Sequence, residues 1–162
     1  MKVINKHEKQ MIEEMLVMQD KLDEEILKVH KCQFDLEKSK LALIDEIGEM
    51  NHENKASWCW WKFTQAPVDR EKLLEELVDV WHFALSINNH TNGVGCINDN
   101  VLVYNRSDSK ISHMIASMIE NEVSVLAWLY DLTLNLGFSI DDIYKGYINK
   151  NKVNYERLKK GY

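Results

Sequence analysis

The chain has 162 residues, of which 45% are hydrophobic, so it can bury one sizeable core and should form a single domain spanning residues 1–162. Its formal net charge of −6 argues against a nucleic-acid partner, because such binding draws most of its free energy from neutralised phosphates. The three cysteines, Cys32, Cys59 and Cys96, have no C-x-x-C spacing, which indicates neither a disulfide framework nor a zinc ribbon.

The N-terminal residues 1–15 alternate charged and apolar side chains. They lack the continuous apolar segment that a signal peptide or a membrane span requires. We therefore expect a cytoplasmic protein with no membrane partner.

The spacing of apolar residues predicts a nearly all-α fold, because long stretches repeat at intervals of three and four and only one proline and six glycines interrupt them. A first helix is predicted from about 6 to 31, and its apolar stripe contains Met11, Met15, Leu22 and Ile26. A second helix should run from about 36 to 54. A third should begin near Asp69, after the single proline, and continue through "EKLLEELVDVWHFALSI".

The segment 88–110 is rich in Asn, Gly, Asp and Ser and is predicted to be mainly loop. Its "VLVY" run is a candidate extended stretch, and its "GVG" indicates a plain turn rather than a phosphate loop. The following "ISHMIASMIENEVSVLAWLYDLTLNLG" predicts one buried helix that stops at Gly137. Ser139 and Asp142 have the spacing of a cap for the last helix.

Two acidic pairs lie on successive predicted helices. Glu46 and Glu49 form E-x-x-E, and Glu76 and Asp79 form E-x-x-D beside the core stripe of Leu73, Leu77, Val80, Trp81 and Ala84. Like charges at this spacing destabilise a helix, so they require compensation unless they are simply solvated faces. If the two helices are antiparallel, the four carboxylates can converge on a cation. Carboxylates without matching His or Cys favour Mg²⁺, with Mn²⁺ as the alternative.

The C-terminal residues 145–162 are basic in an otherwise acidic chain. Six Lys and Arg against one Glu give +5, so the preceding 144 residues carry −11. Lys150, Asn154 and Arg157 share one helical face there, which would suit a metal-bound triphosphate. The alternative is a frayed basic terminus.

Three segments together resemble a known family: "EIGE", then "EELVDVWHF", and finally "KNKVNYERLKKGY". They are similar to the all-α, dimeric-type dUTPases of the helical nucleoside triphosphate pyrophosphohydrolase superfamily. The resemblance runs from "MLVMQDKL" to the terminus. It implies an all-α helical bundle in which paired acidic helices form a metal site and the C-terminal helix is mobile.

The resemblance also implies an activity, which is Mg²⁺-dependent hydrolysis of dUTP, and of dUDP, to dUMP. Water would attack the α-phosphorus, with Glu46 or Glu49 as its base and Glu46 favoured by resemblance. A homodimer is implied, and the abundance of Trp, Met and Leu on the helices favours it as well.

Substrate contacts are implied for Gln19, Asp23, Trp61, Lys62, Phe83, Lys150, Asn151, Asn154, Arg157 and Tyr162. Gln19 would read the uracil edge, because an amide both donates and accepts; otherwise it is a rim residue bonded to another side chain. Asp23 stands where the family has Asn. Trp61 would contact the base and Lys62 the phosphates, although aromatic clusters such as "SWCWWKF" are often core or interface. His82 is predicted to be a satisfied core histidine.

Two alternative functions stay open. One is a related pyrophosphohydrolase that has the same metal site and prefers another base. The other is a non-enzymatic helical interaction module, which would share only the amphipathic helices.

Overall fold

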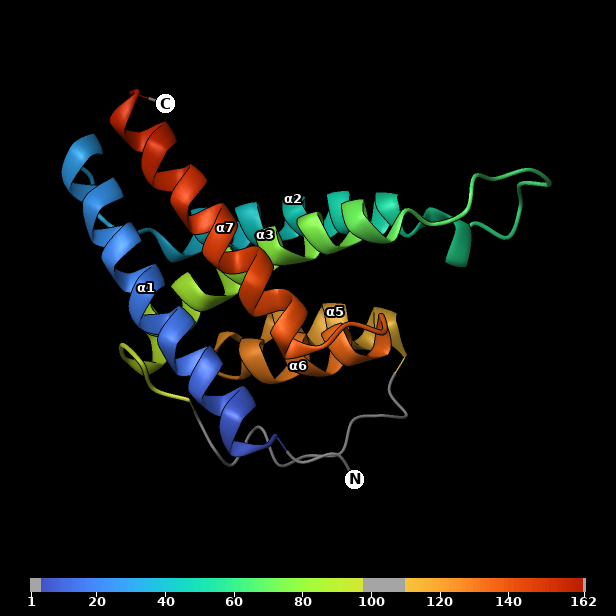
Figure 1. Cartoon of the computed structure of the whole chain (residues 1–162), viewed down its shortest axis with the longest axis horizontal. Coiled ribbons are helices and arrows are strands. Elements are labelled where there is room, and N and C mark those ends of the chain that lie inside the picture. The colour runs from blue at the N-terminus through green and yellow to red at the C-terminus, as the bar shows by residue number, and fades with distance from the viewer. Residues whose placement is uncertain (1–3, 98–109, 162) are drawn as a thin grey trace.

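The computed structural model describes residues 4–97 and 110–161, and within these ranges it contains six α-helices and no strand (Figure 1). The prediction of an all-α fold is confirmed. The helices are α1 (Lys6–His30), α2 (Leu36–Glu53), α3 (Arg70–Asn92), α5 (Ile111–Glu120), α6 (Val125–Asn135) and α7 (Ile140–Lys159), with short 3₁₀ turns η1 (Lys55–Ser57) and η2 (Glu122–Ser124).

Side-chain caps fix where the predicted helices begin. The Asn5 side chain accepts from the backbone N–H of Glu8, whose carboxylate accepts in return, so α1 opens with a capping box. Asp69 accepts from two backbone N–H groups at the start of α3. Ser139 and Asp142 form the predicted capping box of α7.

The prediction of loop from residue 88 is wrong at its start, because α3 continues to Asn92. Asn88 and Asn89 are buried, and their amides find tertiary partners. The Asn89 side chain donates to the Leu16 carbonyl at 2.8 Å, and that of Asn88 donates to the Cys96 carbonyl at 2.9 Å. These long-range bonds outweigh the low helix propensity of Asn.

The "GVG" segment is a plain turn, as predicted. Gly93 and Gly95 adopt left-handed φ angles of 94° and 70°, which favour glycine. The Cys96 N–H donates to the Gly93 carbonyl at 3.1 Å. The predicted extended run "VLVY", residues 101–104, lies outside the described residues.

The single helix predicted before Gly137 is two helices, α5 and α6, which pack against each other. Asn121 ends α5 with an extended conformation, φ −131° and ψ 87°, and η2 follows it. The run "ENEVS", residues 120–124, leads from the last residue of α5 to the start of α6, and the spacing of apolar residues alone did not predict this break. The predicted stop is confirmed, since Gly137 has a left-handed φ of 79°.

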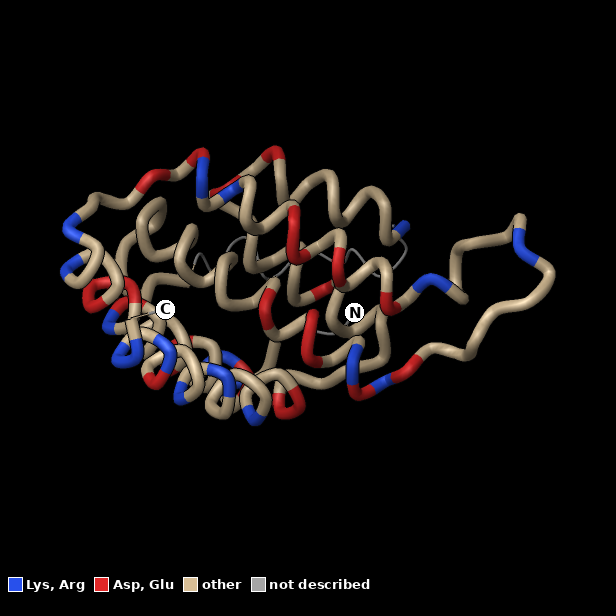
Figure 2. The backbone as a smooth tube through the Cα atoms, turned by 90° about the horizontal axis from the view of Figure 1, so that it is seen from above, with Lys and Arg blue, Asp and Glu red and all other residues tan. Residues whose placement is uncertain are grey.

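Helix α3 is the centre of the bundle and packs against α1, α2, α6 and α7. Its predicted core residues are at most 1% exposed: Leu73, Leu77, Val80, Trp81 and Ala84. Helix α2 runs antiparallel beside α3, and acidic residues lie along the two helices while Lys and Arg gather near the C-terminus (Figure 2). The fold therefore places the acidic pairs side by side and brings the basic helix α7 across them.

A membrane-spanning helix needs about 20 consecutive, predominantly apolar residues. Within the part of the chain that the structure describes, no single helix is long and apolar enough; the segments Glu122–Asn135 and Ile140–Lys159 reach those limits only together, across a bend of 112°.

A close approach at Gly146 joins α7 to α3. A Cβ atom added to Gly146 would lie 2.7 Å from Cγ2 of Val78, a stiff β-branched side chain. We expect Gly146→Ala to lower the free energy of unfolding by about 1–2 kcal/mol, because overpacking costs about 1–3 kcal/mol and the gain in helix propensity offsets only part of it. Urea denaturation measures this change.

Gly48 on α2 is the matched control, because an added Cβ would meet nothing within 4 Å. Gly48→Ala should instead stabilise the chain by up to about 1 kcal/mol through helix propensity. Combining Gly146→Ala with Val78→Ala should recover part of the loss. A Gly146→Ala protein as stable as the Gly48→Ala protein would contradict the close approach.

Candidate metal and nucleotide site

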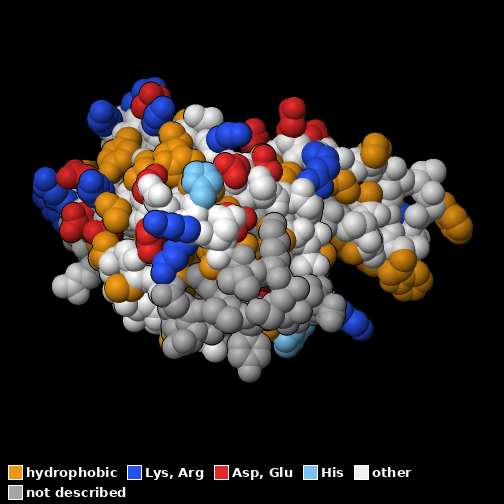
Figure 3. All heavy atoms as spheres, turned by 60° about the horizontal axis from the view of Figure 1, so that its bottom comes forward, with side chains coloured by type: hydrophobic (Ala, Val, Ile, Leu, Met, Phe, Trp, Pro, Cys, Tyr) orange, Lys and Arg blue, Asp and Glu red, His pale blue; other side chains and the backbone are white. Residues whose placement is uncertain are grey.

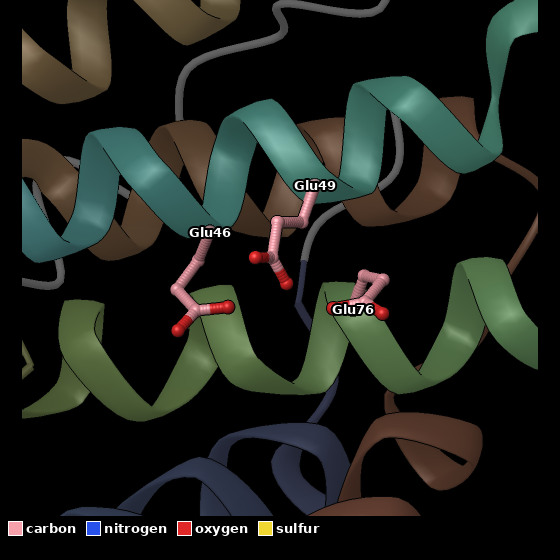
Figure 4. Close-up of side chains that lie close together, drawn as sticks. All are labelled: Glu46, Glu49 and Glu76. Atoms are coloured by element: carbon pink, nitrogen blue, oxygen red, sulfur yellow. The ribbon is translucent and has the colours of Figure 1, made fainter.

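Three of the four predicted acidic residues converge between α2 and α3. Glu46, Glu49 and Glu76 each place a carboxylate oxygen within 4.8 Å of the others, and the three side chains meet in the space between the helices (Figure 4). The i, i+3 spacing puts the first two on the face of α2 that looks onto α3. We refer to these three residues as the glutamate cluster.

Burial and the charges of neighbouring carboxylates raise the pKa values of Glu46 and Glu76 in the glutamate cluster. Burial, followed by the negative charges of Asp79, Glu49 and Glu76, raises the pKa of Glu46 from 4.5 to about 7. Burial and the charge of Glu49 likewise raise the pKa of Glu76. A group of carboxylate oxygens with this spacing fits a hard divalent cation such as Mg²⁺ or Mn²⁺.

The raised pKa of Glu46 predicts a pH dependence of the metal-free protein. Between pH 4.5, the pKa expected when unfolded, and about pH 7, the folded state holds more protons on this group than the unfolded state. The free energy of unfolding should therefore fall as pH rises through this window. Glu46→Gln removes the titration.

Thermal unfolding with and without that substitution, in the presence of a chelator, measures the effect. The Tm of the wild type relative to Glu46→Gln should decrease from about pH 4.5 to about pH 7 and then level off. A Tm difference that is constant over this window would contradict the raised pKa.

Asp79, the fourth predicted ligand, lies outside the cluster and is paired with Lys150. The Lys150 Nζ lies 2.5 Å from Asp79 Oδ2. Burial raises the pKa of Asp79, while the hydrogen bond and the positive charge of Lys150 lower it. The four predicted carboxylates thus divide into a cluster of three and one carboxylate with a lysine partner.

A pocket of about 500 Å³ extends from this acidic end, and its size suits a nucleotide. Glu46 and Asp79 lie at its wall together with six other residues predicted from the sequence: Gln19, Asp23, Phe83, Lys150, Asn154 and Arg157. Side chains from α1, α2, α3 and α7 therefore meet at one cavity, with carboxylates and basic groups both facing it.

A hydrogen-bond network fixes the amide of Gln19 in the wall of the pocket. His82 Nδ1 lies 2.8 Å from Gln19 Oε1, and the Tyr147 hydroxyl donates to the same oxygen at 2.9 Å. The Gln19 amide nitrogen donates to Asp23 Oδ1 at 2.7 Å. Asn151 is buried and supports the network from behind, since its amide donates to the Tyr147 hydroxyl at 3.4 Å.

Two buried atoms at this network have no partner among the described residues, Asp23 Oδ2 and His82 Nε2. Burial lowers the pKa of His82 to about 3, so its ring is neutral. Because Gln19 Oε1 can only accept, His82 Nδ1 donates and Nε2 is left as an acceptor. The predicted satisfied core histidine is therefore buried but only half satisfied.

Burial also raises the pKa of Asp23, against the opposing effect of the nearby Ser86 hydroxyl and the Gln19 amide. A buried polar atom without a partner is costly, and both unpartnered residues line the pocket. Both unpartnered atoms thus belong to residues of the pocket wall.

The sequence did not identify Tyr147 or Phe34 as site residues. Tyr147 is fully buried and stacks on the His82 ring with centroids 4.3 Å apart. Phe34 lines the pocket from the turn between α1 and α2 and stacks on His90 with centroids 3.5 Å apart. A lone aromatic residue in a turn gives no periodic signal, so only tertiary structure identifies Phe34.

Trp61 and Lys62 do not reach the pocket of their own chain. They lie on the segment of residues 54–69, which protrudes from the bundle and which we call the aromatic arm (Figures 1 and 3). Trp61 is 55% exposed and Trp60 88% exposed. Lys62 faces a separate surface hollow. Tyr162, the remaining predicted contact, lies outside the described residues.

Comparison with known proteins adds one match. A family model described as dUTPase matches residues 11–162, a range that includes the glutamate cluster, the pocket and the aromatic arm. No curated protein matches the chain.

Proposed function

Because the chain belongs to the all-α dUTPase family and is a dUTP diphosphatase by that membership, we propose that it hydrolyses dUTP, and also dUDP, to dUMP by a Mg²⁺-dependent attack of water on the α-phosphorus. The observation that carries this proposal is the convergence of Glu46, Glu49 and Glu76 next to a nucleotide-sized pocket. Three carboxylates facing one another in this way fit a divalent cation by the chemistry of their donor atoms.

The glutamate cluster would hold the cation, with Asp79 as a further ligand. When bound, Mg²⁺ supplies positive charge that offsets the phosphate oxygens and makes water a better nucleophile. Glu46 would take a proton from the attacking water, because it is the member of the glutamate cluster that also lines the pocket. The new bond joins water oxygen to the α-phosphorus, and the bond to the β-phosphate breaks.

Lys150 and Arg157 would stabilise the charge that develops on the departing pyrophosphate. Both line the pocket from α7, as does Asn154, which can donate to a phosphate or sugar oxygen. Charge-assisted bonds from Lys and Arg are well suited to phosphate oxygens that a cation leaves free. This assigns the basic face of α7 to the triphosphate.

The fixed amide of Gln19 favours uracil over cytosine. Its oxygen already accepts from His82 and Tyr147, so the group it can still offer is an N–H. Beside it, Asp23 Oδ2 has no partner and can accept. A donor next to an acceptor complements O4 and N3–H of uracil, whereas cytosine presents an amino group and an unprotonated nitrogen. The Asp in place of Asn at position 23 is compatible with this reading.

Release of pyrophosphate from a panel of nucleotides tests the proposal. With Mg²⁺ present, dUTP should react much faster than dCTP, and no nucleotide should react in a chelator. Equal or faster turnover of dCTP would favour a related pyrophosphohydrolase with another base preference. No turnover of any nucleotide would favour a helical interaction module.

We further propose a homodimer, supported by the apolar side chains that one chain leaves exposed. Trp60 and Phe63 on the aromatic arm are 88% and fully exposed, and Leu41 on α2 is 64% exposed. Exposed apolar patches of this kind mark interaction surfaces. Trp61 and Lys62 do not line the pocket of their own chain. In a dimer, the aromatic arm of one chain could contribute them to the pocket of the other chain.

Sedimentation equilibrium at micromolar concentration should give the mass of a dimer. A variant carrying Trp60→Ser and Phe63→Ser should dissociate, because it removes the largest exposed apolar groups of the arm. A fully active wild-type monomer would contradict the proposal. We propose a cytoplasmic location from the three free cysteines, which suit a reducing compartment.

A further inference from the structure

Lys150 and Asp79 form a partly buried ion pair. Only 29% of the Lys150 side chain and 17% of the Asp79 side chain are exposed, and their charged atoms lie 2.5 Å apart. The pair of Lys38 and Asp35, in contrast, leaves 82% and 45% of the side chains exposed. Exposed pairs of that kind contribute little, whereas a desolvated charge depends on its partner. The Lys150 ammonium is therefore firmly associated with Asp79.

Helix packing sets this contact. Gly146 lies one turn before Lys150 on α7, and Val78 immediately precedes Asp79 on α3. Because the Gly146 backbone approaches the Val78 side chain directly, α7 and α3 are held together at this level. The scaffold thus brings the ammonium to the carboxylate without a ligand.

Both charges of the ion pair interact electrostatically with the glutamate cluster. The charge of Asp79 raises the pKa of Glu46, and the charge of Lys150 lowers the pKa values of both Glu46 and Glu76. One internal cation therefore offsets part of a four-carboxylate charge. Lys150 is paired with Asp79, the carboxylate that the metal would need as its further ligand.

We propose that Lys150 is an internal counter-ion that occupies Asp79 until a metal and a nucleotide arrive together, and that its ammonium then exchanges Asp79 for a phosphate group. This inference rests on the proposed function, because it takes the phosphate chain as the second partner. Lys150 also lines the pocket, where phosphate oxygens would offer that partner. The exchange makes Asp79 available only when the displaced ammonium has another anion to neutralise.

The exchange couples the two ligands thermodynamically. A metal alone must either displace Lys150 from Asp79 or bind without that ligand, so its affinity is reduced. A nucleotide that takes up the ammonium removes this penalty, and linkage requires the metal to strengthen nucleotide binding by the same factor. Lys150 is therefore a positioning residue for metal binding as well as a phosphate contact.

Binding of Mn²⁺ without nucleotide tests the proposal, with the free ion followed by electron paramagnetic resonance. Lys150→Met should bind Mn²⁺ about tenfold more tightly than the wild type, within the range of about 5–150-fold for coupled sites. Lys150→Arg, which keeps the charge, should bind as weakly as the wild type. Mn²⁺ affinity in Lys150→Met that is equal to or weaker than that of the wild type would overturn the proposal.

Lys152→Met is the matched control, because Lys152 is an exposed residue of the same helix and its loss changes the net charge equally. Its Mn²⁺ affinity should stay within about twofold of the wild type, since an exposed charge is screened by solvent and salt. If both substitutions tightened binding equally, the effect would be one of net charge and the exchange would be refuted.

A measurement on the wild-type protein avoids any effect of substitution on folding. Acylation of lysines, quantified by mass spectrometry, should be much slower at Lys150 than at the exposed Lys152 in the metal-free protein, and should stay slow at Lys150 at low Mn²⁺ without nucleotide. Acylation of Lys150 as fast as that of Lys152 would contradict its pairing with Asp79. Neither experiment uses a nucleotide, so their outcome is independent of whether dUTP is hydrolysed.

Discussion

The Glu49→Gln enzyme is expected to turn over dUTP about 100- to 1,000-fold more slowly than the wild type at saturating Mg²⁺, the usual loss when one group that stabilises transition-state charge is removed. Glu49 lies in the glutamate cluster with Glu46 and Glu76, and an amide keeps its shape but not its charge. The fold should not suffer, because the substitution relieves repulsion between carboxylates three residues apart on α2. We expect an unchanged or slightly higher Tm.

Asp45→Asn is the control for this prediction. Asp45 is an exposed neighbour on the same helix and lies outside the cluster, so the substitution removes an equal charge from solvent. Its kcat should remain close to that of the wild type. Near-normal turnover by Glu49→Gln at saturating Mg²⁺ would exclude Glu49 as a ligand. Glu76→Gln should behave like Glu49→Gln, and Glu46→Gln should lose more activity because Glu46 would be both ligand and base.

The second large effect is expected at the C-terminus. Deleting residues 150–162 should severely reduce kcat/KM for dUTP, because it removes Lys150, Asn154 and Arg157 from the pocket. Arg157 is exposed in the empty protein, and closure over the triphosphate would desolvate it. Arg157→Ala alone should therefore account for part of the loss, about 2–5 kcal/mol for truncating one partner of a desolvated charge contact. Steady-state kinetics on both variants measure these losses.

Lys160→Ala is the matched control, since Lys160 is exposed beyond the last residue of α7 and does not line the pocket. The alternative of a frayed basic terminus does not describe this segment, which is helical through Lys159. Binding of nucleotide should slow hydrogen exchange in residues 145–161 if closure of this helix accompanies catalysis. Full activity after deletion would overturn its role.

The helices that carry the acidic pairs could be predicted because local signals agree there. Apolar spacing, the Asp69 cap and the E-x-x-E and E-x-x-D pairs all lie within single elements, and the structure places the resulting helices side by side. The ends of elements were harder to predict. Helix α3 extends to Asn92, and within this extension the Asn89 side chain donates a hydrogen bond to the carbonyl of Leu16, which is distant in sequence.

The site was predictable in its residue types and not in its pairings. The sequence identified Asp79 and Lys150 as separate contacts, but their ion pair depends on the packing of α7 against α3 at Gly146. The network around Gln19 depends likewise on Tyr147, a buried residue of α7 that the sequence did not identify as a site residue. Long-range contacts of this kind carry no signature in local periodicity.

Hydrolysis of dUTP in water enriched in heavy oxygen tests the central claim, attack of water on the α-phosphorus with Mg²⁺ bound at the glutamate cluster. Phosphorus NMR and mass spectrometry of the products locate the label. We expect labelled dUMP and unlabelled pyrophosphate with Mg²⁺, the same products formed about 100- to 1,000-fold more slowly with Glu49→Gln, and intact dUTP with a chelator. Label in the pyrophosphate, release of orthophosphate from dUTP, or undiminished hydrolysis in the chelator would contradict the mechanism proposed for this chain.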